Sequence, residues 1–136
     1  MYDNDAKTAK TLSVVAVALD ALFSFSFLIM SVFVTSLISS LGKIYSGFPT
    51  SILPSILLAY AIVELFWMGM TLWLIYRPLK DDRVKDAETP SLFIGIGQLI
   101  FGGFITGIIL LIAWIKIRDS LKFQQKYGND EGFIEP

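Results

Sequence analysis

Long stretches without charge constrain this chain more than any other feature of its sequence. Of the 23 charged residues, only Asp20, Lys43 and Glu64 fall between positions 11 and 74, and none falls between 90 and 115. Hydrophobic residues make up 54% of the chain, more than is usual in a soluble globular domain. Apolar runs of about twenty residues are long enough to cross a hydrocarbon core. The sequence therefore predicts an integral, multi-pass membrane protein.

Three apolar segments are predicted as helices, because a segment in lipid has to satisfy its own backbone hydrogen bonds. The fold class that we predict is an all-α membrane protein, a bundle of three transmembrane helices with a helical C-terminal extension. The helices are expected over about 11–41, 51–76 and 90–126, with a polar linker at 77–89. They form one domain, 1–128, followed by an acidic tail at 129–136 that we expect to be mobile.

Local residues indicate where these helices begin and end. A short loop is expected at 42–50, and Thr89 and Pro90 are predicted as the N-cap and first residue of the third helix. Gly128 is expected to end that helix. The first helix would be about 45 Å long, so it must tilt, bend or project beyond a hydrocarbon core about 30 Å thick.

The third segment admits a second arrangement, because Gly102 and Gly103 lie at its middle. If the segment crosses the membrane, the eleven Lys and Arg residues divide six against five, which gives no orientation signal. If the chain reverses at the two glycines, ten of them lie on one side and Lys43 alone on the other. Irregular backbone at that depth needs cover from protein or water, and the turn is tight, so a plain crossing is favoured.

One face of the first segment carries a stripe of small polar residues. The stripe recurs at spacings of 7, 4, 7, 4 and 4, which places it near one face of a helix: Ser13, Asp20, Ser24, Ser31, Thr35 and Ser39. In lipid, small hydroxyl side chains let helices approach closely and form hydrogen bonds between them. We interpret this stripe as a packing seam, with a hydrated pathway as the alternative.

The third segment carries a second seam, made of glycine and other small residues. Its members are Gly95, Gly102, Gly103, Thr106, Gly107 and Ala113, which include the GxxxG pair Gly103 and Gly107. Removing side chains lets two backbones pack closely in lipid, so we expect a contact face here. The face could meet the first two segments or another copy of the chain.

Asp20 and Glu64 are the two acids inside the apolar segments, and neither has a basic residue in its own segment. An ionised carboxylate at such depth costs several kcal/mol, so each acid needs a proton, a hydrogen-bond partner or water. Tyr60 and Thr71 share the Glu64 face and are its candidate partners. Proton or cation handling is one interpretation of these acids, and a hydrogen bond between helices is the other.

Enzyme chemistry is not expected from this composition. The chain has no Cys and no His, so no nucleophile–base pair is available, and no phosphate-binding glycine motif occurs. No catalytic, cofactor-binding or metal-binding residues are predicted. A net charge of −1 gives no positive electrostatic potential that would attract nucleic acid. Scarcity of Cys, Asn and Gln is typical of thermophilic proteins, although small membrane proteins are also poor in these residues.

The function that we predict is that of a non-catalytic membrane subunit. It would pack through its small-residue seams into a homo-oligomer or a larger membrane complex, so its partners would be lipid, other membrane subunits or copies of itself. One alternative is a small proton- or cation-conducting oligomer that uses Glu64. Further alternatives are a structural subunit of a hydrophobic filament, pilus or viral shell and, if the chain reverses at its glycines, a membrane-shaping protein.

Overall fold

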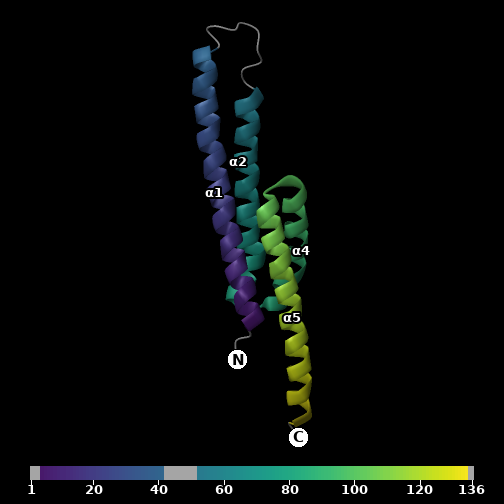
Figure 1. The fold of residues 1–136 in the computed structure, drawn as a ribbon. Coiled ribbons are helices and arrows are strands. Elements are labelled where there is room, and N and C mark those ends of the chain that lie inside the picture. The colour runs from purple at the N-terminus through teal and green to yellow at the C-terminus, as the bar shows by residue number, and fades with distance from the viewer. Residues whose placement is uncertain (1–3, 42–51, 135–136) are drawn as a thin grey trace.

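The structure, a computed structural model, describes residues 4–41 and 52–134, with side chains through residue 126. The predicted loop at 42–50 lies outside the described residues. The described part is helical almost throughout and contains no strand (Figure 1). Its elements are α1 (Asn4–Leu41), α2 (Ile52–Thr71), the π-helical turn η1 (Leu72–Tyr76), α3 (Arg77–Lys80), α4 (Val84–Phe101) and α5 (Phe104–Ile134).

Two helical stretches are long and apolar enough to cross a membrane. One is α1, and the other is the continuous stretch Ile52–Lys80, which joins α2, η1 and α3. They lie side by side and run in opposite directions (Figure 1). The all-helical fold class is therefore confirmed, but only two helices pass this test and three crossings are not confirmed.

In the serine-rich outer half of α1, several hydroxyls form hydrogen bonds within their own helix. Ser26, Ser36 and Ser40 each donate to the backbone carbonyl four residues earlier, at 2.8, 3.0 and 3.1 Å. These hydroxyls need no water or second helix, which makes an exposed serine compatible with an apolar environment.

The third apolar segment is two helices and not the single helix expected over 90–126. The chain breaks at Gly102, whose φ of −144° and ψ of −147° are extended, and reverses so that α4 and α5 pack antiparallel (Figure 1). The Gly102 N–H bonds to the Gln98 carbonyl at 2.9 Å and closes α4. The Gly103 carbonyl accepts from Gly107 at 2.9 Å and opens α5. The plain continuation of the third segment is therefore wrong, and the alternative arrangement, a reversal at the two glycines, is the one in the structure.

The helix boundaries around this hairpin also differ from the prediction. Most of the expected linker 77–89 is helical: α4 begins at Val84, so Pro90 lies inside the helix and not at its start. A buried face of Val84, Ala87 and Ser91 explains the early start, because these residues recur at helical spacing among charged neighbours. At the other end α5 runs past Gly128, since a helical glycine costs about 1 kcal/mol but does not by itself end a helix.

A tight turn joins α3 to α4. Asp82 has a φ of 60°, the left-handed conformation that follows many helix ends. The Arg83 N–H bonds to the Pro78 carbonyl at 2.8 Å and the Asp82 N–H to the Leu79 carbonyl at 3.3 Å. This pair of bonds is a Schellman motif, which satisfies the last carbonyls of the helix.

The core lies in the half of the molecule where all the helices meet. Its buried members come from α1, η1, α3, α4 and α5, and those from α1 are all alanine, so α1 packs closely against α5. These buried residues are Ala6, Ala9, Ala16, Ile75, Leu79, Val84, Ala87, Ile94, Leu110 and Ile117. The outer halves of α1 and α2 rise beyond the hairpin (Figure 1). There, large apolar side chains such as Val32 and Phe33 are 68% and 64% exposed.

Candidate functional site

The two acids of the apolar segments come together at the tip of the hairpin. The Gln98 amide donates to Asp20 Oδ2 at 2.9 Å, across 78 positions of sequence. The Glu64 carboxyl interacts with the Asp20 carboxyl and with the backbone N–H of Gly103, and the Thr106 hydroxyl faces Asp20. We call Asp20, Glu64, Gln98 and Thr106 the acid cluster. Each of its members comes from a different helix, and none is more than 2% exposed.

Two aromatic residues hold the hairpin tip beside the cluster. Phe23 and Trp67 each lie three positions after an acid, on α1 and α2. A Cβ placed on Gly97 would lie 2.5 Å from the Trp67 ring, and one on Gly102 would lie 3.1 Å from Trp67 Nε1. A Cβ on Gly103 would lie 3.5 Å from the Phe23 ring. The glycines therefore let the tip sit directly against the two rings, which supply the cover that irregular backbone needs.

Hydrogen bonds between α1 and α2 continue outward from the cluster. Ser24 donates to the Ala61 carbonyl and Ser31 to the Pro54 carbonyl, both at 3.0 Å. Ala61 is fully buried, so its small side chain permits this close approach.

The predicted polar stripe on α1 is therefore buried over part of its length only. Asp20, Ser24 and Ser31 face other helices, and buried Ser13 bonds back to the Lys10 carbonyl at 2.7 Å. Thr35 and Ser39 are exposed.

The predicted glycine seam lies on both arms of the hairpin and is used within the chain. A Cβ on Gly107 would lie 2.8 Å from the backbone nitrogen of Leu99 and 2.9 Å from the Gly95 carbonyl oxygen. A Cβ on Gly95 would lie 3.1 Å from the Leu111 side chain. These glycines bring α4 and α5 together, while Thr106 and Ala113 are buried on α5.

The two candidate partners of Glu64 have other contacts. Thr71 is buried, but its hydroxyl donates to the Trp67 carbonyl at 2.8 Å. Tyr60 is 48% exposed and stacks on Phe27, with 5.6 Å between the ring centroids. The helical face was identified from spacing alone, and spacing within α2 carries no information about α1 and the hairpin.

Sequence reasoning missed Gln98, Phe23 and Trp67 as parts of the site. Its position in the sequence could have identified Gln98, because it is the one side-chain amide in the uncharged apolar stretch between residues 90 and 115. A buried amide needs partners, and an unpaired acid on another helix is one that it can satisfy.

The cluster has unused capacity to bind a proton or a small cation. Several buried oxygens have no hydrogen-bond partner among the described residues: Asp20 Oδ1, Glu64 Oε2, Gln98 Oε1 and Thr106 Oγ1. Two carboxyl groups can share a hydrogen bond only if one of them carries a proton. The cluster can thus hold one proton between its acids and present its remaining oxygens to a second proton or a monovalent cation.

Charged side chains are otherwise confined to the opposite end of the hairpin. Within the described chain they occur in three stretches, 5–10, 77–88 and 116–126, which lie at one end of the bundle (Figure 1). Lys116 pairs with Asp5 at 3.2 Å and so ties α5 to α1. Arg77 lies 4.8 Å from the Trp73 ring centroid.

Arg118 is placed in the same way on α5, 5.0 Å from the Trp114 ring centroid. Tryptophan next to a cationic residue is typical of a membrane–water interface.

No protein-family model, curated protein or solved structure matches this chain. Its function is therefore inferred from the acid cluster, the hairpin and the charged end.

Proposed function

We propose that this chain is a structural, non-catalytic integral membrane protein that shapes the bilayer by filling its two leaflets unequally. In this proposal α1 and α2 cross the membrane, and the α4–α5 hairpin enters from the charged side and turns near the midplane. The observation that carries it is the reversal at Gly102 and Gly103, which leaves the outer halves of α1 and α2 without the hairpin beside them.

Helix lengths support this placement. The stretch from Lys10 to Ser31 measures about 32 Å at 1.5 Å per residue, and that from Pro54 to Trp73 about 29 Å. Both agree with a hydrocarbon core of about 30 Å. The two stretches end at the same level, because Ser31 bonds to the Pro54 carbonyl, and α1 projects beyond that level to Leu41.

In this proposal the hairpin tip lies about halfway through the membrane, by the same rise per residue. From Trp114 back to Gly103, α5 rises about 17 Å, roughly half of the hydrocarbon core. The acid cluster beside the tip would then lie near the midplane. Backbone that turns at this depth is tolerated where protein covers it, and Phe23 and Trp67 provide that cover.

The charge distribution supports an orientation. Apart from Lys43, between α1 and α2, every Lys and Arg of the chain falls in the stretches at the charged end. Positive residues near membrane helices are enriched on the cytoplasmic side, so we place the N-terminus, the α3–α4 turn and α5 beyond Trp114 there.

Unequal filling of the leaflets is a source of curvature. Four helices occupy the cytoplasmic leaflet in this placement and two occupy the other, so the protein is a wedge. A wedge that is wider on one side expands that leaflet and bends the membrane with the charged face on the convex side. The small-residue seams expected to join subunits are used inside the chain, which favours this role over assembly through those seams.

Cysteine labelling tests the topology on a background that contains no native Cys. Ser40→Cys and Asp119→Cys place exposed thiols at the end of α1 and on α5 beyond Trp114. An impermeant thiol reagent should label the two positions from opposite faces of a sealed vesicle. Labelling of both from the same face would mean that the third segment crosses, and the proposal would fail.

Reconstitution into vesicles tests the shaping role. The wild-type protein should reduce vesicle diameter or draw out tubules as the protein-to-lipid ratio rises, as measured by electron cryomicroscopy. Gly107→Ala, which forces α4 away from α5, should weaken this effect, whereas Gly69→Ala should not, since a Cβ at Gly69 meets nothing within 4 Å. Vesicles that keep their size at every ratio would contradict membrane shaping.

The acid cluster favours a second candidate function, proton or cation conduction. The unpaired oxygens of Asp20 and Glu64 give a titratable group near the proposed midplane. Proton flux into liposomes should then occur with the wild type and stop in Glu64→Gln. If wild-type protein inserted in tight liposomes carries neither protons nor sodium, this candidate is eliminated, while the shaping role is unaffected.

A further inference from the structure

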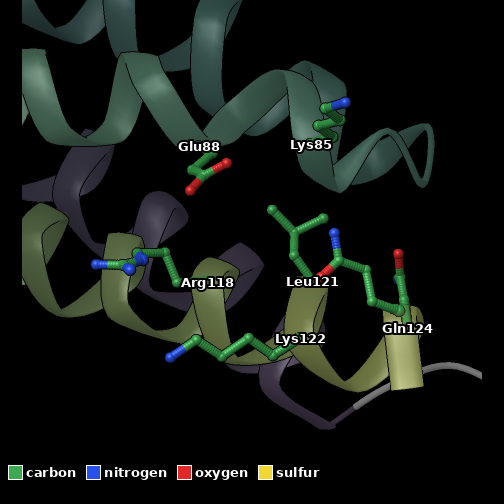
Figure 2. A pocket seen from close by; sticks show the side chains of 7 residues that line it. Lys85, Glu88, Arg118, Leu121, Lys122 and Gln124 are labelled. Carbon is green, nitrogen blue, oxygen red and sulfur yellow. The ribbon is translucent and has the colours of Figure 1, made fainter. Parts of the chain in front are cut away.

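A hollow between α4 and α5 at the charged end has the features of a ligand site. Its volume is about 470 Å³, and it lies beyond the half-buried side chain of Leu121 (Figure 2). Lys85 and Glu88 reach it from α4, and Arg118 and Lys122 from α5, with two glutamines completing the lining. We call it the basic groove. We propose that the basic groove binds the phosphodiester headgroup of an anionic membrane lipid, an inference that rests on the membrane placement proposed above.

The basic groove carries an excess of unpaired positive charge. Three cationic side chains line it against the single carboxylate of Glu88. None of the ion pairs found among the described residues involves Lys85, Arg118 or Lys122. A phosphodiester carries one negative charge and accepts charge-assisted hydrogen bonds from such groups. The groove therefore lacks an anion of the kind that a lipid headgroup supplies.

A second hollow nearby carries a smaller excess of positive charge than the basic groove. That hollow is lined by Trp73, Arg77, Arg83 and Asp86, among others. Arg83 is already paired there, with Asp86 at 3.3 Å and with Asp81 at 3.5 Å. In the second hollow one cation, Arg77, is outside these ion pairs, whereas in the basic groove all three cations are.

The depth of the groove matches the phosphate layer of a bilayer. Arg118 follows Trp114 by one helical turn, about 6 Å farther from the membrane centre, and Lys122 by two turns, about 12 Å. The Trp114 ring holds the Arg118 guanidinium near that depth, 5.0 Å from the ring centroid. A lipid phosphate is held just outside the hydrocarbon core by its acyl chains, whereas a soluble phosphate is not held at this depth.

Glu88 favours a headgroup that carries hydroxyl groups. Its carboxylate points from α4 into the space facing Arg118 and Leu121 (Figure 2). A carboxylate accepts hydrogen bonds but repels a second negative charge, so it disfavours a phosphate dianion. A phosphodiester that bears a glycerol headgroup satisfies both demands, because its charge meets the cations and its hydroxyls donate to Glu88. The ligand class is thus an anionic phospholipid of the phosphatidylglycerol type.

The test compares lipids on the full chain in detergent micelles. Phosphatidylglycerol should raise the melting temperature and stay bound in native mass spectrometry. Phosphatidylcholine, phosphatidylethanolamine and soluble glycerophosphoglycerol, the same phosphodiester without acyl chains, should do neither. The double variant Arg118→Gln, Lys122→Gln should weaken phosphatidylglycerol binding about tenfold or more, since a hydrogen bond to a charged group contributes about 1.5–3 kcal/mol. Lys126→Gln, exposed on α5 outside the groove, is the matched control.

Three results would overturn the inference. Equal stabilisation by phosphatidylcholine would remove the selectivity for an anionic headgroup. Equal loss of binding in Lys126→Gln would reduce the effect to general surface charge, and equal binding of soluble glycerophosphoglycerol would exclude a lipid site. The Ser40→Cys and Asp119→Cys labelling distinguishes this failure from failure of the membrane placement. If the two positions still label from opposite faces and no lipid is preferred, only the basic groove proposal fails.

Discussion

The two halves of this molecule are built from the same two long helices and hold them together differently. In the half at the charged end, α1 and α2 pack against the hairpin with buried alanines, glycines and larger apolar residues. Among the described residues of the outer half they pack on each other, through Ser24, Ser31 and the stacked rings of Phe27 and Tyr60, and expose large side chains such as Phe33. The acid cluster lies at the boundary between the halves.

This difference shows that one pair of helices can be held together in two ways, with a third layer of helix in one half and without it in the other. Lipid tails are as apolar as leucine, so helices in lipid associate through close packing and hydrogen bonds and not through burial of apolar area. The outer half has close packing and hydrogen bonds between its two helices, without a third helix beside them. The inner half adds a third layer of helix, which can support a buried polar cluster and a break in the backbone. Variants that act on one half alone test this division.

The largest effect is expected where the hairpin arms touch. In Gly107→Ala the new Cβ would lie 2.8 Å from the backbone nitrogen of Leu99, and backbone cannot move aside as a side chain can. We expect a loss of about 3 kcal/mol in the free energy of unfolding, the upper range for overpacking. Titration with a denaturing detergent, followed by tryptophan fluorescence, measures it.

Gly69→Ala is the matched control for that variant. Its Cβ would meet nothing within 4 Å, and alanine is the better helix former, so stability should stay level or rise by up to about 1 kcal/mol. If both variants lose stability equally, close packing of α4 on α5 is not what holds the inner half together.

The next effect is expected at the boundary between the halves. Gln98→Leu removes the donor to Asp20 Oδ2 and leaves a buried carboxylate oxygen unpaired, which should cost about 2 kcal/mol. Asp20→Asn keeps an acceptor in the same place and should cost less. A double-mutant cycle over the two positions should give a coupling of about 1 kcal/mol, and additive losses would show that the bond does not stabilise the fold.

Much of the inner half could not be predicted from sequence, and Gln98 shows why. The two long helices, their buried acids and the seam from Ser13 to Ser31 follow from periodicity within one segment. The hairpin does not, because Gly102 and Gly103 permit a turn without requiring one. What decides it is cover from Phe23 and Trp67, which lie on other helices. The start of α4 could not be predicted for a similar reason, because its buried residues are interspersed with charged residues that are typical of a loop.

A smaller effect is expected in the outer half. Ser24→Ala and Ser31→Ala each remove a hydrogen bond between α1 and α2, and bonds of this kind in membranes contribute about 0.6 kcal/mol on average. Ser26→Ala is the control, because its hydroxyl bonds to the Leu22 carbonyl of its own helix. Hydrogen exchange of the outer α2 backbone should speed up in the first two variants only. Equal rates in all three would mean that the serines do not join the helices.

The smallest effect should be a gain, at the turn that feeds the hairpin. Asp82 adopts a φ of 60° in the Schellman motif, where a side chain is crowded and glycine is not. Asp82→Gly should therefore stabilise the protein by about 0.5 kcal/mol, since relief of the crowding is partly offset by a more flexible unfolded chain. Lys80→Gly, at the last residue of α3, is the control and should destabilise by up to about 1 kcal/mol, because Lys80 has helical backbone angles that glycine does not favour. Because the turn belongs to the inner half, hydrogen exchange should slow in α4 and stay unchanged in the outer part of α1. Slower exchange in both would mean that the halves unfold as one unit, and the division between them would then describe packing but not stability.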